Sequence, residues 1–184
     1  MTARILVICT GNVCRSPVAA TMLGATLEGD FEVFSRGTFA QPGQPVSTTM
    51  TELLRDRMRL EPPADGAQRL TPSDVERADL VLGLERDHRS AAVGLYPGAV
   101  RRAFTLAEFS RLLTQIDTRL PARGYAFDRL EELVQRANQA RRPVPPAMDN
   151  IDDPMGLAQA LYEAAFDRIR GDVERIVQIL SRRG

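Results

Sequence analysis

Short apolar runs alternate with amphipathic stretches along the chain. The first run lies in residues 4–8 (RILVI), and it is too short and too rich in β-branched residues for a helix, which predicts a buried strand. Further strands are expected at residues 31–35, 79–84 and 100–104. Strands that alternate with helices are typical of parallel βαβ units. The pattern therefore predicts an α/β fold, a doubly wound four-stranded parallel sheet flanked by helices.

The helices are expected from the same periodicity and from their end signals. After the first strand, Ser16 is a plausible N-cap and Pro17 suits the first helical position, with the helix running to about Glu28. A proline-rich connector at residues 141–146 precedes the last helix. A short helix is expected to begin at residues 71–74, and residues 87–94 are expected to be helical or turn-like. The other expected helices cover residues 47–59, 106–113, 125–140 and 155–181.

Length and composition indicate a soluble globular protein. The 184 residues suffice for one domain with its own core, so a single domain is expected over residues 1–184. No apolar stretch approaches the roughly 20 residues that span a bilayer, and the N-terminus lacks a signal-peptide pattern. The two cysteines share one loop, unlike those of a secreted disulfide scaffold. These features predict a reducing, cytoplasmic setting.

Charge narrows the classes of function. The 24 basic and 24 acidic residues cancel, which argues against a general nucleic-acid or membrane-surface binder. All the basic residues are arginine, and the chain has no lysine. This excludes a Schiff-base lysine and the lysine of a nucleotide-binding P-loop.

The most informative segment is the loop of residues 9–17, CTGNVCRSP, between the first strand and its helix. In an open α/β sheet, ligands bind at the carboxyl ends of the strands, where Cys9 lies. The loop amides can converge on an anion, and the helix N-terminus adds positive charge that also favours a thiolate. Arg15 can hold two oxygens of a tetrahedral anion through its planar guanidinium. The loop therefore predicts a nucleophilic thiolate beneath a bound oxyanion.

This Cys-x5-Arg-Ser-Pro motif, placed between a strand and a helix, resembles the phosphate loop of the low-molecular-weight protein tyrosine phosphatase family. The resemblance includes residues 35–38 (SRGT), residues 78–82 (ADLVL) and the Asp153-Pro154 pair, and it covers about residues 4–113 and 149–181. It implies an enzyme that hydrolyses protein phosphotyrosine or a related phosphomonoester through a cysteinyl-phosphate intermediate. It also implies release of inorganic phosphate, with no metal or other cofactor.

The resemblance assigns roles within this site. Cys9 is implied to be the nucleophile, and Asp153 first protonates the leaving oxygen and then acts as the base for water, with Asp152 as the neighbour most easily confused with it. The implied phosphate-binding residues are Thr10, Gly11, Asn12, Val13, Cys14 and Arg15.

Supporting roles follow from the same resemblance. Ser16 is expected to donate a hydrogen bond to the Cys9 sulfur, and Asn12 is expected to hold the loop with Ser35 as one partner. Cys14 is a redox candidate, because it is close enough to Cys9 for a reversible disulfide, although a small buried filler is an equal alternative.

The chain departs from the family pattern around the substrate. Tyrosine-specific members line the pocket with aromatic side chains, whereas Met155 follows the Asp-Pro pair here and Gln41, near Phe39, stands at the other aromatic position. Val13 occupies the position of a threonine in protein-arginine phosphatases, and Asp65 that of a family histidine. The substrate pocket is expected to comprise Val13, Phe39, Gln41 and Met155.

Three alternatives to a tyrosine phosphatase stay open. Protein-arginine phosphatases and thiol-coupled arsenate reductases have the same fold and loop, although the reductases that relay a disulfide need cysteines beyond Cys14. A non-catalytic phosphate-binding or redox-sensing protein belongs to a different class.

Several segments receive structural expectations only. His88 is expected to be a solvated helix residue without a role, and the pairs Arg101-Arg102 and Arg141-Arg142 are expected to face solvent. Asp149 and Asp152 are candidates for capping the last helix. Residues 115–147 exceed what compact family members need, so a helical insertion is expected there, packed near the pocket and limiting which substrates enter.

Overall fold

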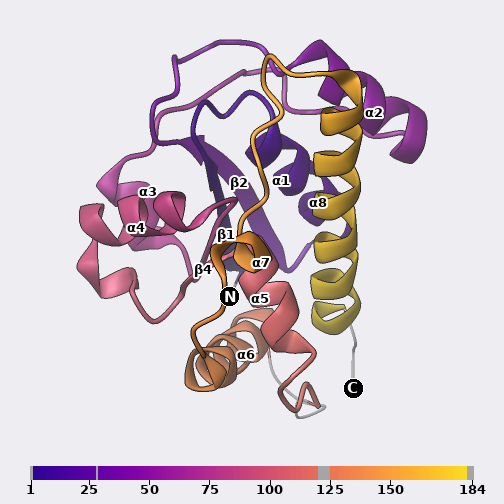
Figure 1. Ribbon diagram of the computed structural model, residues 1–184. Coiled ribbons are helices and arrows are strands. Elements are labelled where there is room, and N and C mark those ends of the chain that lie inside the picture. Colours follow the sequence, from indigo (N-terminus) through magenta and orange to yellow (C-terminus); the bar gives the residue numbers. More distant parts are fainter. Residues whose placement is uncertain (1, 28, 120–124, 182–184) are drawn as a thin grey trace.

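The computed structural model describes residues 2–27, 29–119 and 125–181. Its sheet has four parallel strands in the order β2-β1-β3-β4, so the α/β fold predicted from the sequence is confirmed (Figure 1). Because β2 and β3 lie on opposite sides of β1, the sheet grows in one direction and then in the other. Ligands bind at such a reversal, beyond the carboxyl ends of the strands. The strands are β1 (Ala3–Cys9), β2 (Phe31–Gly37), β3 (Leu80–Gly83) and β4 (Ala103–Thr105).

Helices cover both faces of the sheet. Alternate residues of β1 point to opposite faces: Ile5 and Val7 join a core with α1, α5 and α8, whereas Leu6 and Ile8 join one with α3 and α4. Both faces of the strands are therefore buried, as in parallel sheets generally. The described helices are α1 (Arg15–Thr26), α2 (Thr48–Met58), α3 (Pro72–Arg77), α4 (Arg86–Leu95), the 3-10 turn η1 (Pro97–Ala99), α5 (Leu106–Leu113), α6 (Ala126–Ala140), α7 (Pro146–Asp149) and α8 (Gln159–Leu180).

The end of β2 is fixed against the loop that follows β1. Cys9 pairs with Gly37 at the last position of the two strands. A Cβ atom added at Gly37 would lie 2.6 Å from the Thr10 carbonyl oxygen and 2.9 Å from the Asn12 nitrogen, so this approach requires glycine. The Phe39 N–H donates to the Thr10 carbonyl at 2.9 Å. These contacts hold the loop and the segment after β2 together.

Two helix boundaries differ from the sequence prediction. α1 begins at Arg15, so Ser16 lies in its first turn and its expected role as N-cap is wrong. The physical reason is that the Ser16 hydroxyl contacts the Cys9 sulfur at 3.0 Å. The predicted end at Glu28 lies outside the described residues. α8 begins at Gln159 rather than near Met155, because the preceding residues form a turn closed by the Leu157 N–H and the Pro154 carbonyl.

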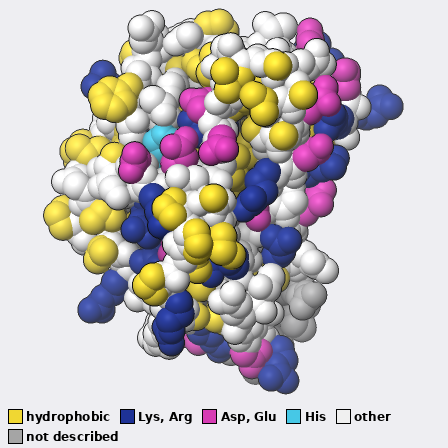
Figure 2. All heavy atoms as spheres, in the orientation of Figure 1, with side chains coloured by type: hydrophobic (Ala, Val, Ile, Leu, Met, Phe, Trp, Pro, Cys, Tyr) yellow, Lys and Arg dark blue, Asp and Glu magenta, His cyan; other side chains and the backbone are white. Residues whose placement is uncertain are grey.

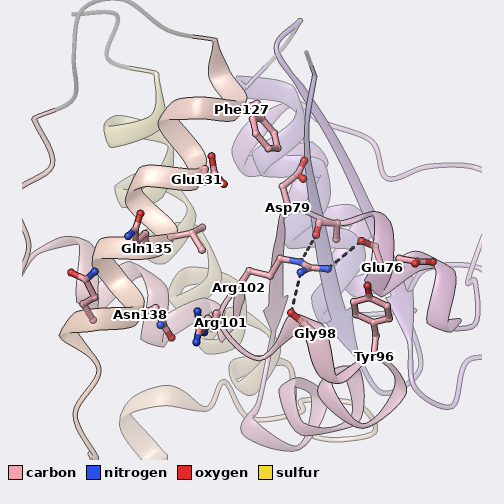
Figure 3. A pocket seen from close by; sticks show the side chains of 13 residues that line it. Glu76, Asp79, Tyr96, Gly98, Arg101, Arg102, Phe127, Glu131, Gln135 and Asn138 are labelled. Atoms are coloured by element: carbon pink, nitrogen blue, oxygen red, sulfur yellow. Dashed lines mark hydrogen bonds between the residues drawn. The ribbon is translucent and has the colours of Figure 1, made fainter.

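The predicted helix near residues 125–140 is present as α6, but its position differs from the expectation. α6 lies at the end of the sheet where the strands begin, opposite the loop after β1 (Figure 1). Leu130 and Leu133 are fully buried in the main core. Between α6 and the start of β3 lies a groove of about 820 Å³, lined by Phe127 and Tyr96 among others (Figure 3). The expectation that the insertion packs near the pocket is therefore wrong for α6.

Two arginines predicted to face solvent are instead structural. Arg102 donates to the carbonyls of Ala78 at 2.7 Å and Gly98 at 3.1 Å, beside the groove (Figure 3). Arg141 forms an ion pair with Glu108 at 3.0 Å, with its guanidinium carbon 3.9 Å from the centre of the Phe104 ring. The solvent-facing interpretation is wrong for both, because each half-buried guanidinium bonds to oxygen atoms of other segments. Their neighbours Arg101 and Arg142 are exposed as predicted.

Among the described residues, no helix combines the length and the apolar character needed to cross a membrane.

Candidate active site

Cys9 ends β1 and is 2% exposed. Its sulfur lies 3.0 Å from Ser16 Oγ and accepts the Asn12 backbone N–H at 3.3 Å. Asn12 Nδ2 donates to Ser16 Oγ at 3.0 Å, and the Ser16 hydroxyl has two acceptors in reach, the Cys9 sulfur at 3.0 Å and the Arg36 carbonyl at 3.4 Å. The sulfur thus lies beside one backbone donor, one hydroxyl group and the N-terminus of α1.

Asn12 supports the loop from within. Its φ of 55° places it in the left-handed region, which is unfavourable for a residue other than glycine. Its Nδ2 donates to Ser35 Oγ at 2.8 Å, and its Oδ1 accepts the Gln68 backbone N–H at 2.8 Å. The structure thus places Ser35 beside Asn12, and a backbone amide completes the set. No sequence pattern could have identified Gln68, because almost every residue carries such an amide.

Arg15 connects three segments around the loop. It is 1% exposed, and its Nη1 donates to the Glu85 carboxylate and, at 2.8 Å, to the Ile151 carbonyl. Its Nη2 lies 2.8 Å from Asp153 Oδ2. Among the described residues, Arg15 Nε has no hydrogen-bond partner. A buried donor without a partner is unfavourable, and an anion bound in the loop would satisfy it.

The segment that carries Asp153 is held by its own backbone. The Ile151 N–H donates to the Leu84 carbonyl at 2.9 Å, and Asn150 Oδ1 accepts the Arg86 N–H at 3.0 Å. The Asp153 side chain remains 40% exposed. Its carboxylate can therefore contact both Arg15 and a ligand that enters from solvent.

Asp149 has a structural part in this arrangement. It is buried, and its two oxygens pair with Arg86 at 2.6 Å and Arg111 at 3.1 Å. Its expected role as a cap of the last helix is wrong, because α8 begins ten residues later. The two ion pairs instead fix the start of the Asp153 segment against α4 and α5. Asp152 is exposed.

His88 is buried, so the expectation of a solvated residue is wrong. Its Nε2 lies 2.9 Å from Thr10 Oγ1, and its Nδ1 accepts the Glu85 backbone N–H at 3.0 Å. Burial lowers the pKa of His88 and the Arg15 charge lowers it further, against the opposing effect of Glu85. The sequence offers no sign of this, because the RDHR run resembles a solvated helix face.

Cys14, the redox candidate, is buried beside the site. Burial raises the pKa of its thiol to about 12, with further contributions from Asp153 and Cys9. The two cysteines are not joined by a disulfide in the structure. At neutral pH Cys14 is therefore protonated and a poor nucleophile. Its disulfide with Cys9 stays a prediction.

The residues predicted to line the substrate pocket differ in exposure. Val13 is 6% exposed and packs with Ala40 and Ala67. In contrast, Phe39 is 73% exposed, Met155 is 43% exposed, and Gln41 is exposed. Acidic side chains gather across the face of the molecule seen in Figure 2, beside the cyan histidine. The exposed part of the predicted pocket, its rim, thus offers one aromatic ring, one thioether and one amide to a ligand.

The doubly wound sheet thus carries a cysteine at the end of β1 and a buried arginine at the start of α1, around one loop. The family model described as "Low molecular weight phosphotyrosine protein phosphatase" matches residues 4–142. The chain belongs to this family and is a phosphoric monoester hydrolase that acts on phosphorylated substrates. Asp153 lies outside the matched residues.

The chain is similar both to tyrosine phosphatases and to an arginine phosphatase. A probable low molecular weight protein-tyrosine-phosphatase, EpsP of Ralstonia nicotianae, is 33% identical over 145 residues, which cover 78% of this chain and 96% of that protein. The structure of the YwlE arginine phosphatase from Geobacillus stearothermophilus superposes with a TM-score of 0.71 at 27% identity, covering 97% of this chain and 93% of that one. The tyrosine phosphatase of T. tengcongensis gives a TM-score of 0.70 at 26% identity, covering 96% and 99%.

Proposed function

We propose that the protein hydrolyses phosphomonoesters through a cysteinyl-phosphate intermediate on Cys9, with Arg15 and the amides of residues 10–15 as the anion site and Asp153 as the general acid and base. One observation carries the proposal. The buried Arg15 guanidinium lies between the loop that begins at Cys9 and the Asp153 carboxylate, 2.8 Å from the latter. This contact supports the proposal that one group binds the anion and the other supplies the proton at the same site.

In the first half-reaction, the Cys9 thiolate attacks phosphorus and the bond to the leaving oxygen breaks. The loop amides and Arg15 stabilise the charge on the other phosphate oxygens. A bound phosphate competes with Asp153 for the Arg15 guanidinium and places negative charge beside it. The Asp153 carboxyl is released from this contact and, in its protonated form, gives its proton to the leaving oxygen.

In the second half-reaction, the Asp153 carboxylate takes a proton from water, and the resulting hydroxide attacks the phosphorus. The sulfur–phosphorus bond breaks, and the products are inorganic phosphate and the Cys9 thiolate. The Ser16 hydroxyl, 3.0 Å from the sulfur, stabilises this thiolate as a leaving group. The site returns to its starting protonation state.

The test of this mechanism is hydrolysis of p-nitrophenyl phosphate by the wild type and two matched cysteine variants in the presence of a chelator. Cys9→Ser is expected to abolish hydrolysis, whereas Cys14→Ser should retain it, because the buried Cys14 is a thiol. Hydrolysis that survives in Cys9→Ser would refute the mechanism. A wild type that binds inorganic phosphate without hydrolysis would favour a non-catalytic phosphate-binding protein instead.

For the substrate, protein phosphotyrosine is the leading candidate. The exposed Phe39 follows β2, and its backbone bonds to the loop at Thr10, so its ring can pack against a phenyl group. Phe39→Ala is expected to raise KM for a phosphotyrosine peptide several-fold while inorganic phosphate inhibits as before. An unchanged KM would contradict this role of the ring.

Phosphoarginine protein is the second candidate, favoured by the YwlE similarity and by the non-aromatic Gln41 and Met155 on the rim. A comparison of kcat/KM on a phosphotyrosine peptide and a phosphoarginine protein separates the two, with the larger value expected for phosphotyrosine. The third measurement is kcat/KM for the reduction of arsenate by a small thiol. A larger value for phosphoarginine would reassign the substrate and leave Cys9 as the nucleophile of a hydrolysis. A larger value for arsenate would reassign the reaction to a reduction in which the thiols are oxidised to a disulfide.

A further inference from the structure

His88 is the single histidine of the chain, and its ring joins two segments that build the site. It lies between Thr10 Oγ1, at 2.9 Å, and the Glu85 backbone nitrogen, at 3.0 Å. A backbone N–H can only donate, so Nδ1 is the unprotonated nitrogen. The hydrogen of the neutral ring therefore resides on Nε2 and is donated to Thr10.

Glu85 extends this connection to the anion-binding arginine. It precedes α4, its backbone is bonded to His88, and its carboxylate accepts from Arg15 Nη1. The turn before α4 is tight: a Cβ atom added at Gly83 would lie 2.9 Å from the Glu85 carbonyl oxygen and 3.1 Å from the His88 Cβ. A shift of the backbone that the histidine holds would also move the base of the Glu85 side chain, and with it the carboxylate that accepts from Arg15. A continuous set of hydrogen bonds thus runs from the phosphate loop through His88 and Glu85 to the guanidinium.

We propose that His88 is a positioning residue of the phosphatase reaction: its neutral ring fixes the phosphate loop through Thr10 and the Arg15 guanidinium through Glu85, and protonation of the ring releases Glu85. The proposal rests on the proposed function, because it gives His88 a task in the same site. His88 touches neither the Cys9 sulfur nor Asp153 through a hydrogen bond in the structure, so it acts through its two partners.

The charges around the ring set the direction of the pH effect. Burial and the charge of Arg15, on α1, lower the pKa of His88; Glu85, Asp153 of the acid segment and Asp87 of α4 oppose them. The folded-state pKa lies below the ordinary value, so the ring is neutral at neutral pH and becomes charged only as the pH falls below about 6.5. A charged ring carries hydrogens on both nitrogens, and its Nδ1–H then opposes the Glu85 N–H, so this bond is lost.

The protonation state can be measured without turnover. Because the untagged chain has one histidine, its ring nitrogens give unambiguous NMR signals. We expect the Nε2–H tautomer at about pH 7.5 and a titration midpoint below about 6.5. A ring that carries its hydrogen on Nδ1, or that is charged at neutral pH, would overturn the proposal even if every variant failed to fold.

Two substitutions separate the two contacts of the ring. His88→Gln keeps a donor for Thr10, and His88→Asn keeps an acceptor for the Glu85 N–H. Each should lower kcat/KM for p-nitrophenyl phosphate roughly tenfold at neutral pH. Because Arg15 binds the anion, His88→Gln should also weaken inhibition by inorganic phosphate more than His88→Asn does. The ratio of wild-type to His88→Gln kcat/KM should shrink as the pH falls, because protonation removes the same Glu85 contact from the wild type.

The control is Ala91→Gly, which weakens α4 from a half-buried position and removes neither hydrogen bond of the ring. It should keep the wild-type kcat/KM. An equal loss in Ala91→Gly, or a ratio independent of pH, would show that His88 only stabilises α4. A wild type that hydrolyses nothing would overturn the proposed function itself, whereas an active wild type matched by both His88 variants would overturn this inference alone.

Discussion

At the scale of single residues, Asn12 combines an unfavourable backbone conformation with a favourable set of contacts. Its positive φ costs on the order of 1 kcal/mol for a residue other than glycine. Its buried side chain offsets this cost through bonds to Ser16, Ser35 and the Gln68 amide. The loop geometry is therefore maintained by one amide side chain in the middle of the phosphate site.

Two substitutions of Asn12 should separate backbone strain from side-chain support. Asn12→Ala loses the bonds and keeps the strain, with a loss of about 2–4 kcal/mol in the free energy of unfolding. Asn12→Gly loses the same bonds but tolerates the positive φ, so its loss should be about 1 kcal/mol smaller. Urea unfolding measures both, and equal losses would show that the conformation of Asn12 carries no strain.

The adjacent carboxylates Asp152 and Asp153 form a natural pair of test and control. Asp153 contacts Arg15, whereas Asp152 is exposed. Asp153→Asn should lower kcat about 10²-fold or more on phenyl phosphate, whose leaving group needs a proton, and less on p-nitrophenyl phosphate. Asp152→Asn should stay within about twofold of the wild type on both. Equal losses in the two variants, measured by steady-state kinetics, would withdraw the acid role from Asp153.

At the scale of elements, local sequence patterns predicted the structure correctly where a residue type strongly prefers one environment or one position in a helix. The apolar run of β1, the capping box at Thr71 and the amphipathic α6 were all predictable, because burial and helix ends leave clear patterns. Side chains that bond across elements were not. The sequence favours Ser16 as a helix cap, yet its hydroxyl contacts the Cys9 sulfur instead. The polar neighbours of His88 in the sequence indicate an exposed residue, yet its ring is bonded to Thr10.

The start of α3 is an element whose stability should depend on pH. Asp74 accepts bonds from the Thr71 backbone and hydroxyl and pairs with Arg36 of β2 at 3.2 Å. Burial alone would raise the pKa of Asp74, but the Thr71 bonds and the Arg36 charge together lower it below its ordinary value of 3.8. Its contribution is therefore complete above about pH 4 and is lost as the pH falls through the lower, folded-state value.

Asp74→Asn should consequently lower the free energy of unfolding by about 1–2 kcal/mol at neutral pH, and the difference from wild type should narrow toward about pH 3. Urea titrations at several pH values measure this difference. The control is Glu61→Gln, which removes the exposed pair with Arg55 and should leave stability unchanged. A difference that stays constant with pH would show that ionised Asp74 is not the stabilising form.

At the scale of the whole molecule, the two ends of the sheet have separate tasks. The site lies at the carboxyl ends of the strands, while α6 and the large groove lie at the opposite end (Figures 1 and 3). The two ends are linked through residues 141–150, where Arg86 bonds to the Val144 carbonyl and to Asp149. Because the insertion at residues 115–147 comes just before Asp153 in the sequence, it was expected to lie near the pocket. In the fold, its helix α6 lies at the other end of the sheet.

Removal of packing from α6 should therefore change stability without changing catalysis. Leu133→Ala, at a fully buried position of the main core, should lower the free energy of unfolding by about 2–5 kcal/mol. The kcat/KM of the folded protein on small and protein substrates should stay within about twofold of the wild type, because no contact of the site is removed. The exposed Glu131→Gln on the same helix is the matched control and should change neither quantity. If Leu133→Ala lowered kcat/KM on protein substrates but not on small ones, α6 would after all limit which substrates enter.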